Sequence, residues 1–397
     1  MTSNAKSNSE QEDFSLMLGG PFYQALRRLR LSGNALESPV RRAVAICTIA
    51  WVPLLILAFS SGKATGNSPV PFIRDYAVHI RFLVAVPLML VAEVVIHRRM
   101  RLLRHEFDKR KLIPENFRTR FDEIIRSAFA LRNSLFAEGA IAAFVYIVGV
   151  HYIWRPYATI DGSTWYTSTA DGSTGLNAAG FWYGYVSIPF FQFLFLRWYY
   201  RIFIWSRFLW QVSRIPLRLD ALHPDKVGGL GFLSEIVSSF APLSMMHGAV
   251  LSGLIANMIF HTGGHLQDYK VQIVLVVAMV WIILLFPFLF FIGQLMDVKR
   301  KGVQQYGELG SAYVDAFKAK WLENDTPKKD DLIGTSDIQS LADLSNSYEA
   351  MSKMRITPIS RENLVLLAVT TLAPLVPLLL TMMPLEELLK ALLGVIA

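Results

Sequence analysis

The stretch VQIVLVVAMVWIILLFPFLFFIGQL, from Val271 to Leu295, contains 25 residues and no charged side chain. About 20 mostly apolar residues in a helix cross the hydrocarbon core of a bilayer, so this stretch predicts a transmembrane helix. The composition of the chain agrees with that reading. Of 397 residues, 53% are hydrophobic and only 18% are charged, whereas soluble domains carry about 25% charged residues. The sequence therefore predicts a membrane protein.

Six further stretches are long and apolar enough to span a bilayer. We therefore expect an all-α, polytopic protein with about six or seven transmembrane helices and helical extensions outside the membrane. The last stretch contains Pro374 and Pro377 and is followed by Pro384, so it either crosses fully or enters and returns. The seven predicted spans are Ala43 to Ser60, Ala77 to Ile96, Phe136 to Trp154, Phe181 to Trp205, Phe240 to Phe260, Val271 to Leu295 and Leu364 to Met383.

These spans divide the chain into four regions. Residues 1–42 form a polar N-terminal segment in which Pro21 to Leu31 predicts an interfacial helix on anionic lipid. Residues 43–295 hold six spans in three hairpins, with loops 97–135 and 206–239. Residues 296–363 are a helical region outside the membrane, and residues 364–397 hold the seventh span and an amphipathic tail.

Lys and Arg alternate sharply between the segments that separate the spans. Segments on one side carry 33 of them and segments on the other side carry 5, when Arg197 and Arg201 are counted with the loop that they precede. Cytoplasmic segments carry the excess of basic residues, so we expect the N-terminus to be cytoplasmic. The net charge of +8 then reports orientation and contact with anionic lipid headgroups, not nucleic acid. No glycosylation sequon lies on the outer side, and we expect a bacterial inner membrane.

A proline recurs in the returning helix of each hairpin, at Pro87, Pro189 and Pro287. Spacings of 102 and 98 residues separate the three prolines, which is compatible with a threefold hairpin repeat. The alternative is coincidence, because proline is common in membrane helices.

An apolar stripe, Tyr306, Leu309, Tyr313, Phe317 and Trp321, follows the sixth span at helical spacing and needs a partner to bury it. Two other segments outside the membrane have similar faces, so we expect one helical bundle drawn from three loops. Those segments are 117–131 and 338–351.

Two carboxylates and two guanidiniums occur at one depth near the cytoplasmic ends of three spans. They are Glu93, Glu138, Arg197 and Arg201, the last two on one face of their helix. Ionisable residues inside a membrane are costly and are candidates for function. We expect interhelical salt bridges that act either as a structural clamp or as a gate.

The fifth span carries His247 near its middle and Asn257 towards its outer end. These two residues are candidates for lining a pore or sensing pH. Ser244, Gly248, Ser252 and Ala256 form a small-residue face on the same helix. Such a face also lets a second helix pack closely, which is the competing interpretation.

The loop LRLDALHPDKVGGLGFL, from Leu217 to Leu233, predicts either an anion-binding turn or a hinge. Its glycines permit backbone conformations that other residues avoid, and successive amides in such a turn can hold an anion. The alternative is a structural elbow leading into the fifth span. The candidate residues are His223, Asp225, Lys226, Gly228, Gly229 and Gly231.

Enzyme signatures such as GxSxG, HExxH and CxxC do not occur in the sequence, so we expect neither an enzyme nor a cofactor. The HTGGH segment, residues 261–265, has the spacing of metal ligands, but its glycines favour a turn, and we expect no metal. The leading hypothesis is a channel-like or transporter-like homo-oligomer that is gated by helix movement at the cytoplasmic side. Alternatives are a scaffold or signalling protein that recruits a cytoplasmic partner, and a lipid-handling enzyme.

Overall fold

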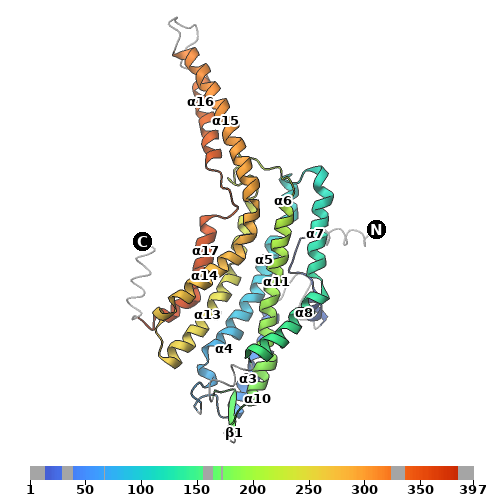
Figure 1. Cartoon of the computed structure of the whole chain (residues 1–397), viewed down its shortest axis with the longest axis vertical. Helices are drawn as coiled ribbons and strands as arrows, with labels where there is room; N and C mark the ends of the chain where they lie inside the picture. Colours follow the sequence, from blue (N-terminus) through green and yellow to red (C-terminus); the bar gives the residue numbers. More distant parts are fainter. Residues whose placement is uncertain are drawn as a thin grey trace.

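A computed structural model shows a bundle of long helices running along one axis (Figure 1), and it describes residues 14–28, 39–66, 68–154, 164–170, 173–322 and 336–382. Seven helices are long and apolar enough to cross a membrane, which confirms the all-α, multi-pass prediction. They are Val40–Ser60, Tyr76–Lys109, Leu135–Trp154, Ala178–Val212, Phe232–Thr262, Leu266–Trp321 and Arg361–Leu379. The seventh predicted span is thus helical, and the amphipathic tail beyond residue 382 lies outside the described residues.

Several of these long helices are divided by short π or 3-10 turns. The regular α-helices are α2 (Pro21–Arg28), α3 (Pro39–Ser60), α4 (Tyr76–Ile80), α5 (Val86–Met100), α6 (Leu103–Lys109), α7 (Arg118–Arg132), α8 (Leu135–Phe144), α10 (Ala178–Trp182), α11 (Ile188–Val212), α12 (Phe232–Ser239), α13 (Ala241–Thr262), α14 (Lys270–Leu285), α15 (Ile292–Trp321), α16 (Asp337–Ser352), α17 (Arg361–Leu372) and α18 (Val376–Leu379). The short turns are η1 (Phe72–Arg74), η2 (Arg81–Ala85), η3 (Glu115–Phe117), η4 (Val145–Trp154), η5 (Tyr183–Ser187), η6 (Leu266–Tyr269), η7 (Phe286–Phe291) and η8 (Ala373–Leu375).

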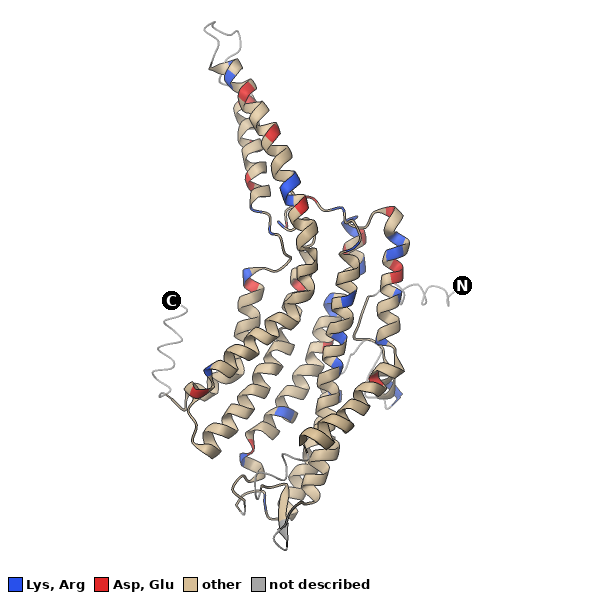
Figure 2. Cartoon of the chain, in the orientation of Figure 1, with Lys and Arg blue, Asp and Glu red and all other residues tan. Residues whose placement is uncertain are grey.

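The two ends of the bundle differ in charge. Most Lys and Arg residues lie towards the end that carries α6, α7 and the α15–α16 hairpin, which we call the basic end (Figure 2). The opposite end, which we call the far end, carries a two-stranded antiparallel sheet. Its strands are β1 (Thr167–Ala170) and β2 (Ser173–Leu176), with Thr167 opposite Leu176. Charge therefore separates along the bundle axis as the sequence predicts.

A single tryptophan links the starts of two membrane helices at the far end. Asp75 caps α4 and Asn177 caps α10, each through its side-chain oxygen. Trp165 is fully buried between them. Its indole Nε1 donates to Asp75 Oδ2 at 2.9 Å, and its carbonyl oxygen accepts from Asn177 Nδ2 at 2.8 Å. The loop before β1 thereby holds the two helix starts together.

A local repeat relates two of the three hairpins. Pro87 and Pro189 each lie 12 residues after their capping residue and two residues after the end of a π-helical turn, η2 or η5. Proline has no backbone N–H and interrupts the hydrogen bonds of an α-helix, and in both helices a π turn lies just before that interruption. The first residues of the two turns also meet, because Arg81 Nη1 donates to the Tyr183 hydroxyl at 2.7 Å. Pro287 instead lies inside the 3-10 turn η7, so this device is twofold and not threefold.

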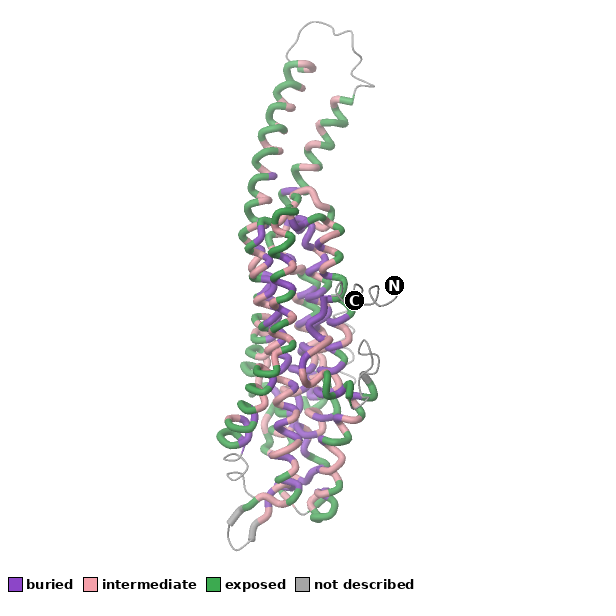
Figure 3. The backbone as a smooth tube through the Cα atoms, turned by 90° about the vertical axis from the view of Figure 1, so that its right-hand side faces the viewer, coloured by how far each residue is buried: buried purple, intermediate pink, exposed green. Residues whose placement is uncertain are grey.

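The helices outside the apolar spans do not form the single bundle that the sequence predicts. Helix α7 packs on α11, with Phe121 and Ile124 buried. Helix α15 instead runs for 30 residues and pairs with α16 in a hairpin that projects beyond the bundle (Figures 1 and 3). Buried residues concentrate in the membrane bundle, whereas most of the hairpin surface is exposed (Figure 3). The prediction of one bundle drawn from three loops is therefore wrong, because the helices of residues 296–363 pair with each other.

Candidate functional site

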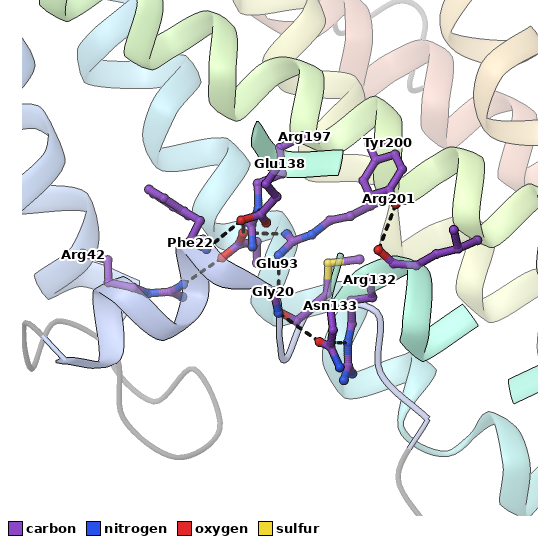
Figure 4. Close-up of polar contacts among 12 residues, drawn as sticks. Gly20, Phe22, Arg42, Glu93, Arg132, Asn133, Glu138, Arg197, Tyr200 and Arg201 are labelled. Carbon is purple, nitrogen blue, oxygen red and sulfur yellow. Dashed lines mark hydrogen bonds and ion pairs between the residues drawn. The ribbon is translucent and has the colours of Figure 1, made fainter. Parts of the chain in front are cut away.

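Glu93 on α5 is the centre of a buried ionic cluster near the basic end (Figure 4). Its Oε2 accepts from Arg42 Nη1 at 2.7 Å, and its Oε1 accepts from Arg197 Nη1 at 3.1 Å and Arg201 Nη1 at 2.6 Å. One carboxylate thus joins three guanidiniums from two other helices, α3 and α11.

Glu138 on α8 completes the cluster. Its Oε1 accepts from Arg197 Nε at 2.8 Å and its Oε2 accepts from the Phe22 backbone N–H at 2.6 Å. Arg197 therefore bridges the carboxylates of two helices. We call Arg42, Glu93, Glu138, Arg197 and Arg201 the charge cluster. The structure joins the four residues that the sequence places at one depth and adds Arg42.

The charge cluster holds one more positive than negative side chain. All five side chains are buried, and Arg42 is fully so. Its Nε and Nη2 have no hydrogen-bond partner within the described ranges. Removing one partner from a buried ion pair leaves the other charge buried without a counter-charge, which lowers the stability of the protein by about 3–5 kcal/mol. The geometry is that of a clamp: each carboxylate is engaged by more than one donor and no charged side chain of the cluster faces open space.

A short N-terminal segment, residues 14–20, is inserted beside the cluster, and we call it the strap. Arg201 Nη2 donates to the Met17 carbonyl at 3.3 Å, and Arg132 Nη1 donates to the Ser15 carbonyl at 2.6 Å. Burial lowers the pKa of Arg132 to about 10, so its guanidinium stays charged at neutral pH. Phe14 packs on Phe129 and Phe208 with ring centroids 5.6 and 4.5 Å apart. The strap therefore closes the bundle between α7 and α11.

Two glycines allow the strap to approach the helices. Gly19 and Gly20 adopt φ values of +135° and +90°, a conformation that other residues rarely take. A Cβ on Gly20 would lie 2.9 Å from Glu138 Oε1, and one on Gly19 would lie 2.6 Å from Asn133 Oδ1. The Gly20 N–H donates to that same Asn133 oxygen at 3.1 Å. A side chain at either position would push the strap away from the cluster.

Helix α2 follows the strap and packs on the bundle. Leu26 is buried, and the Arg197 guanidinium lies 5.0 Å from the centre of the Phe22 ring. Leu26 and Phe22 thus turn towards the bundle, and contact of this helix with anionic lipid stays a prediction. Arg27 and Arg28 are exposed, and Leu29 to Leu31 lie outside the described residues.

His247 on α13 is held by two neighbours. Its Nε2 lies 2.8 Å from the Tyr199 hydroxyl, and its Nδ1 lies 2.7 Å from the Leu243 carbonyl. The small-residue face of the same helix packs on α17: a Cβ on Gly248 would lie 1.8 Å from the Thr371 carbonyl oxygen. Such a close approach of two helices is what the packing interpretation of the small-residue face predicts.

Asn257 is also engaged in helix packing. Its Nδ2 donates to Asp75 Oδ1 at 2.9 Å, and its Oδ1 accepts from the Ala77 N–H at 3.4 Å. Asn257 thus ties α13 to the cap of α4. These contacts favour helix packing, and pore lining or pH sensing by His247 and Asn257 stays a prediction.

The glycine loop between α11 and α12 is an elbow organised by its own carboxylate. Asp225 Oδ1 accepts from the backbone N–H groups of Val227 and Gly229, and Oδ2 accepts from that of Gly231, at 2.8–3.1 Å. Lys226, Gly228 and Gly229 have positive φ values, which turn these amides inward. Asp225 therefore fills the position that an external anion would take, so these contacts favour the structural elbow, and anion binding by this loop stays a prediction.

Neighbouring charges support this elbow. Arg110 Nη1 donates to Asp225 Oδ2 at 3.1 Å and to the Gly229 carbonyl at 2.8 Å, and His223 Nδ1 lies 2.9 Å from Asp225 Oδ1. Burial opposes ionisation of Asp225, but the backbone donors and His223 lower its pKa below the usual value. Arg110, directly after α6, is thus a main support of the elbow.

No group of three or more His, Cys, Asp or Glu residues that could hold a metal ion occurs among the described residues. Comparison of the chain with protein-family models, curated proteins and solved structures found no match.

Removing the Arg197 side chain, which bridges the carboxylates of Glu93 and Glu138, should lower the free energy of unfolding of the bundle. Arg197→Ala leaves Glu138 and part of Glu93 buried without a guanidinium, so we expect a loss of about 3–5 kcal/mol. Arg126 is exposed on α7, so Arg126→Ala should change stability by less than about 0.5 kcal/mol. Thermal denaturation of both variants in one detergent measures the difference. Equal melting temperatures would contradict the clamp.

Neutralising Asp225 should weaken the elbow in a pH-dependent way. Because its pKa is lower in the folded protein, its contribution is present above the unfolded value of about 4 and disappears as the pH falls through the folded value. Asp225→Asn should cost about 1–3 kcal/mol at pH 7, and the gap to wild type should shrink at pH 3. Asp220→Asn, at an exposed position of the same loop, is the control. A gap that stays constant with pH would refute the assignment.

Proposed function

We propose that this protein is a membrane scaffold that assembles with a second copy of itself through the α15–α16 hairpin. The observation that carries the proposal is the hairpin itself, which leaves the bundle as a separate pair of helices (Figure 1). The bundle serves as its anchor, and we propose that the basic end faces the cytoplasm because Lys and Arg concentrate there. A bacterial inner membrane suits this orientation.

The hairpin buries its apolar stripe only in part. Tyr306, Tyr313, Phe317 and Trp321 are half-buried against α16, and Leu309 is 55% exposed. On α16, Ile338 is 50% exposed. Two helices alone cannot enclose such a stripe, whereas four helices around one core can. A second hairpin would supply the two missing helices.

Charge complementarity favours a second copy as the partner. Helix α15 has a net positive charge and α16 has a net negative charge. A two-fold dimer places the same surfaces against each other in reverse, so α15 of each copy faces α16 of the other. Opposite charges then meet across both contacts. The charged residues are Asp297, Lys299, Arg300, Lys301, Glu308, Asp315, Lys318 and Lys320 on α15, and Asp337, Asp343 and Glu349 on α16.

Transport is the second candidate, and the strap favours it. A channel or transporter that opens at the basic end needs a closing element there, and residues 14–20 occupy that place between α7 and α11. In this proposal the present structure is a closed state. Absence of ion or solute flux in liposomes that contain folded, inserted protein, under gradients of voltage, pH or solute, would eliminate this candidate.

The scaffold proposal predicts a dimer whose stability depends on the exposed side chain of Leu309. Leu309→Glu should raise the dissociation constant of the dimer at least about tenfold, because the interface would bury an unpaired carboxylate. Ser311→Glu adds the same charge on a different face of α15 and should leave the dimer intact. Native mass spectrometry of the full chain in detergent measures both.

Two results would overturn the proposal. One is a wild-type protein that stays monomeric at every concentration, and the other is a Leu309→Glu dimer as stable as wild type. Melting temperatures of the variants serve as the folding control.

A further inference from the structure

A groove opens at the basic end where α11 ends and α15 begins. Its volume is about 420 Å³, and its lining includes Trp210, Arg214, Phe290, Gly293 and Asp297. The charge-free stretch that ends at Leu295 supplies the apolar part of the lining, and the first charged residue after it, Asp297, supplies the polar part. The groove therefore lies at the boundary between apolar and charged surface, where phospholipid headgroups lie in a bilayer.

The walls of the groove are fixed by one amide side chain. Gln294 Nε2 donates to the carbonyls of Ser213 and Ile215 at 2.6 and 2.7 Å, and its Oε1 accepts from the Leu217 N–H at 3.3 Å. These bonds tie the chain leaving α11 to the first turn of α15. The two walls of the groove are therefore held in place by contacts within the chain.

Two charged side chains on opposite walls lack strong partners. Arg214 lies over the Trp210 ring, 5.5 Å from its centre, and its guanidinium has no ion pair within the described ranges. Asp297 pairs only with Arg300, at 3.4 Å, and both side chains are well exposed. Such exposed pairs contribute little, so Asp297 is open to a stronger cation.

We propose that this groove binds a phospholipid whose headgroup carries a phosphate and a primary ammonium. Arg214 would bind the phosphate, since guanidinium matches phosphate oxygens with two parallel donors. Asp297 would accept hydrogen bonds from the ammonium. Trp210 is 44% exposed and belongs to the aromatic type enriched at membrane interfaces. Phe290 and Gly293 leave an apolar path for the glycerol and upper chain region, because a Cβ on Gly293 would meet no atom within 4 Å.

The test uses the full chain in detergent and native mass spectrometry. Phosphatidylethanolamine and phosphatidylglycerol are added separately, and inorganic phosphate is added as a competitor. Wild type should retain phosphatidylethanolamine more strongly than phosphatidylglycerol. Arg214→Ala should weaken retention of both lipids about tenfold, the value of one charge-assisted hydrogen bond. Asp297→Asn should remove the preference for phosphatidylethanolamine and leave phosphatidylglycerol unchanged.

Two further variants separate binding from folding. Gly293→Leu fills the groove without changing charge and should also lower retention of both lipids. Arg126→Ala removes an exposed arginine far along α7 and should change neither. Retention that is unaffected by Arg214→Ala and Gly293→Leu would overturn the site. An unchanged lipid preference in Asp297→Asn would overturn the ammonium assignment. Complete displacement of the lipid by millimolar inorganic phosphate would assign the groove to a soluble phosphate instead.

Discussion

The ionisation of Glu93 inside the bundle is the constraint on which the rest of the structure depends. A carboxylate taken out of water is tolerated only when several donors replace its hydration. Here three arginines do so, and they come from α3 and α11. The helices must therefore keep fixed positions around α5, and Arg197 extends the same requirement to Glu138 on α8. The strap closes over this arrangement because its carbonyls accept one hydrogen bond each from Arg201 and Arg132.

The contacts that hold the two ends of the bundle distinguish it from the α15–α16 hairpin. The far end is fixed by Trp165 between two helix caps, and the basic end is fixed by the charge cluster and by the Asp225 elbow. The base of the α15–α16 hairpin packs on the elbow, because Arg355 Nη2, just beyond α16, donates to the Asp225 carbonyl at 3.4 Å. The outer part of the hairpin projects beyond both supports and has the half-buried surface of an unfinished helical bundle. This contrast is why assembly through the hairpin explains the geometry better than a charge-lined pathway, in which the same arginines and glutamates would have to part.

Much of this architecture can be predicted from the sequence, because seven apolar runs and the alternation of basic residues are local patterns. The pairing of Glu93 and Glu138 with Arg197 and Arg201 is also predictable, since their depth follows from the spans. Other features depend on contacts between distant segments. Arg42 and Glu93 are 51 residues apart, and Gly20 and Asn133 are 113 apart. The short apolar strap inside a polar N-terminus gives no periodic signal, and a glycine loop does not reveal that its own Asp225 will occupy it.

Hydrogen exchange across residues 14–22 tests the central role of Glu93 most directly. Arg201 links this segment to Glu93, because it donates both to the Glu93 carboxylate and to the Met17 carbonyl, so the protection of these amides should depend on Glu93. In the wild type they should exchange slowly, and in Glu93→Gln they should exchange at least about tenfold faster, corresponding to about 1.4 kcal/mol. Rapid exchange in the wild type, or unchanged rates in a folded Glu93→Gln protein, would contradict the account.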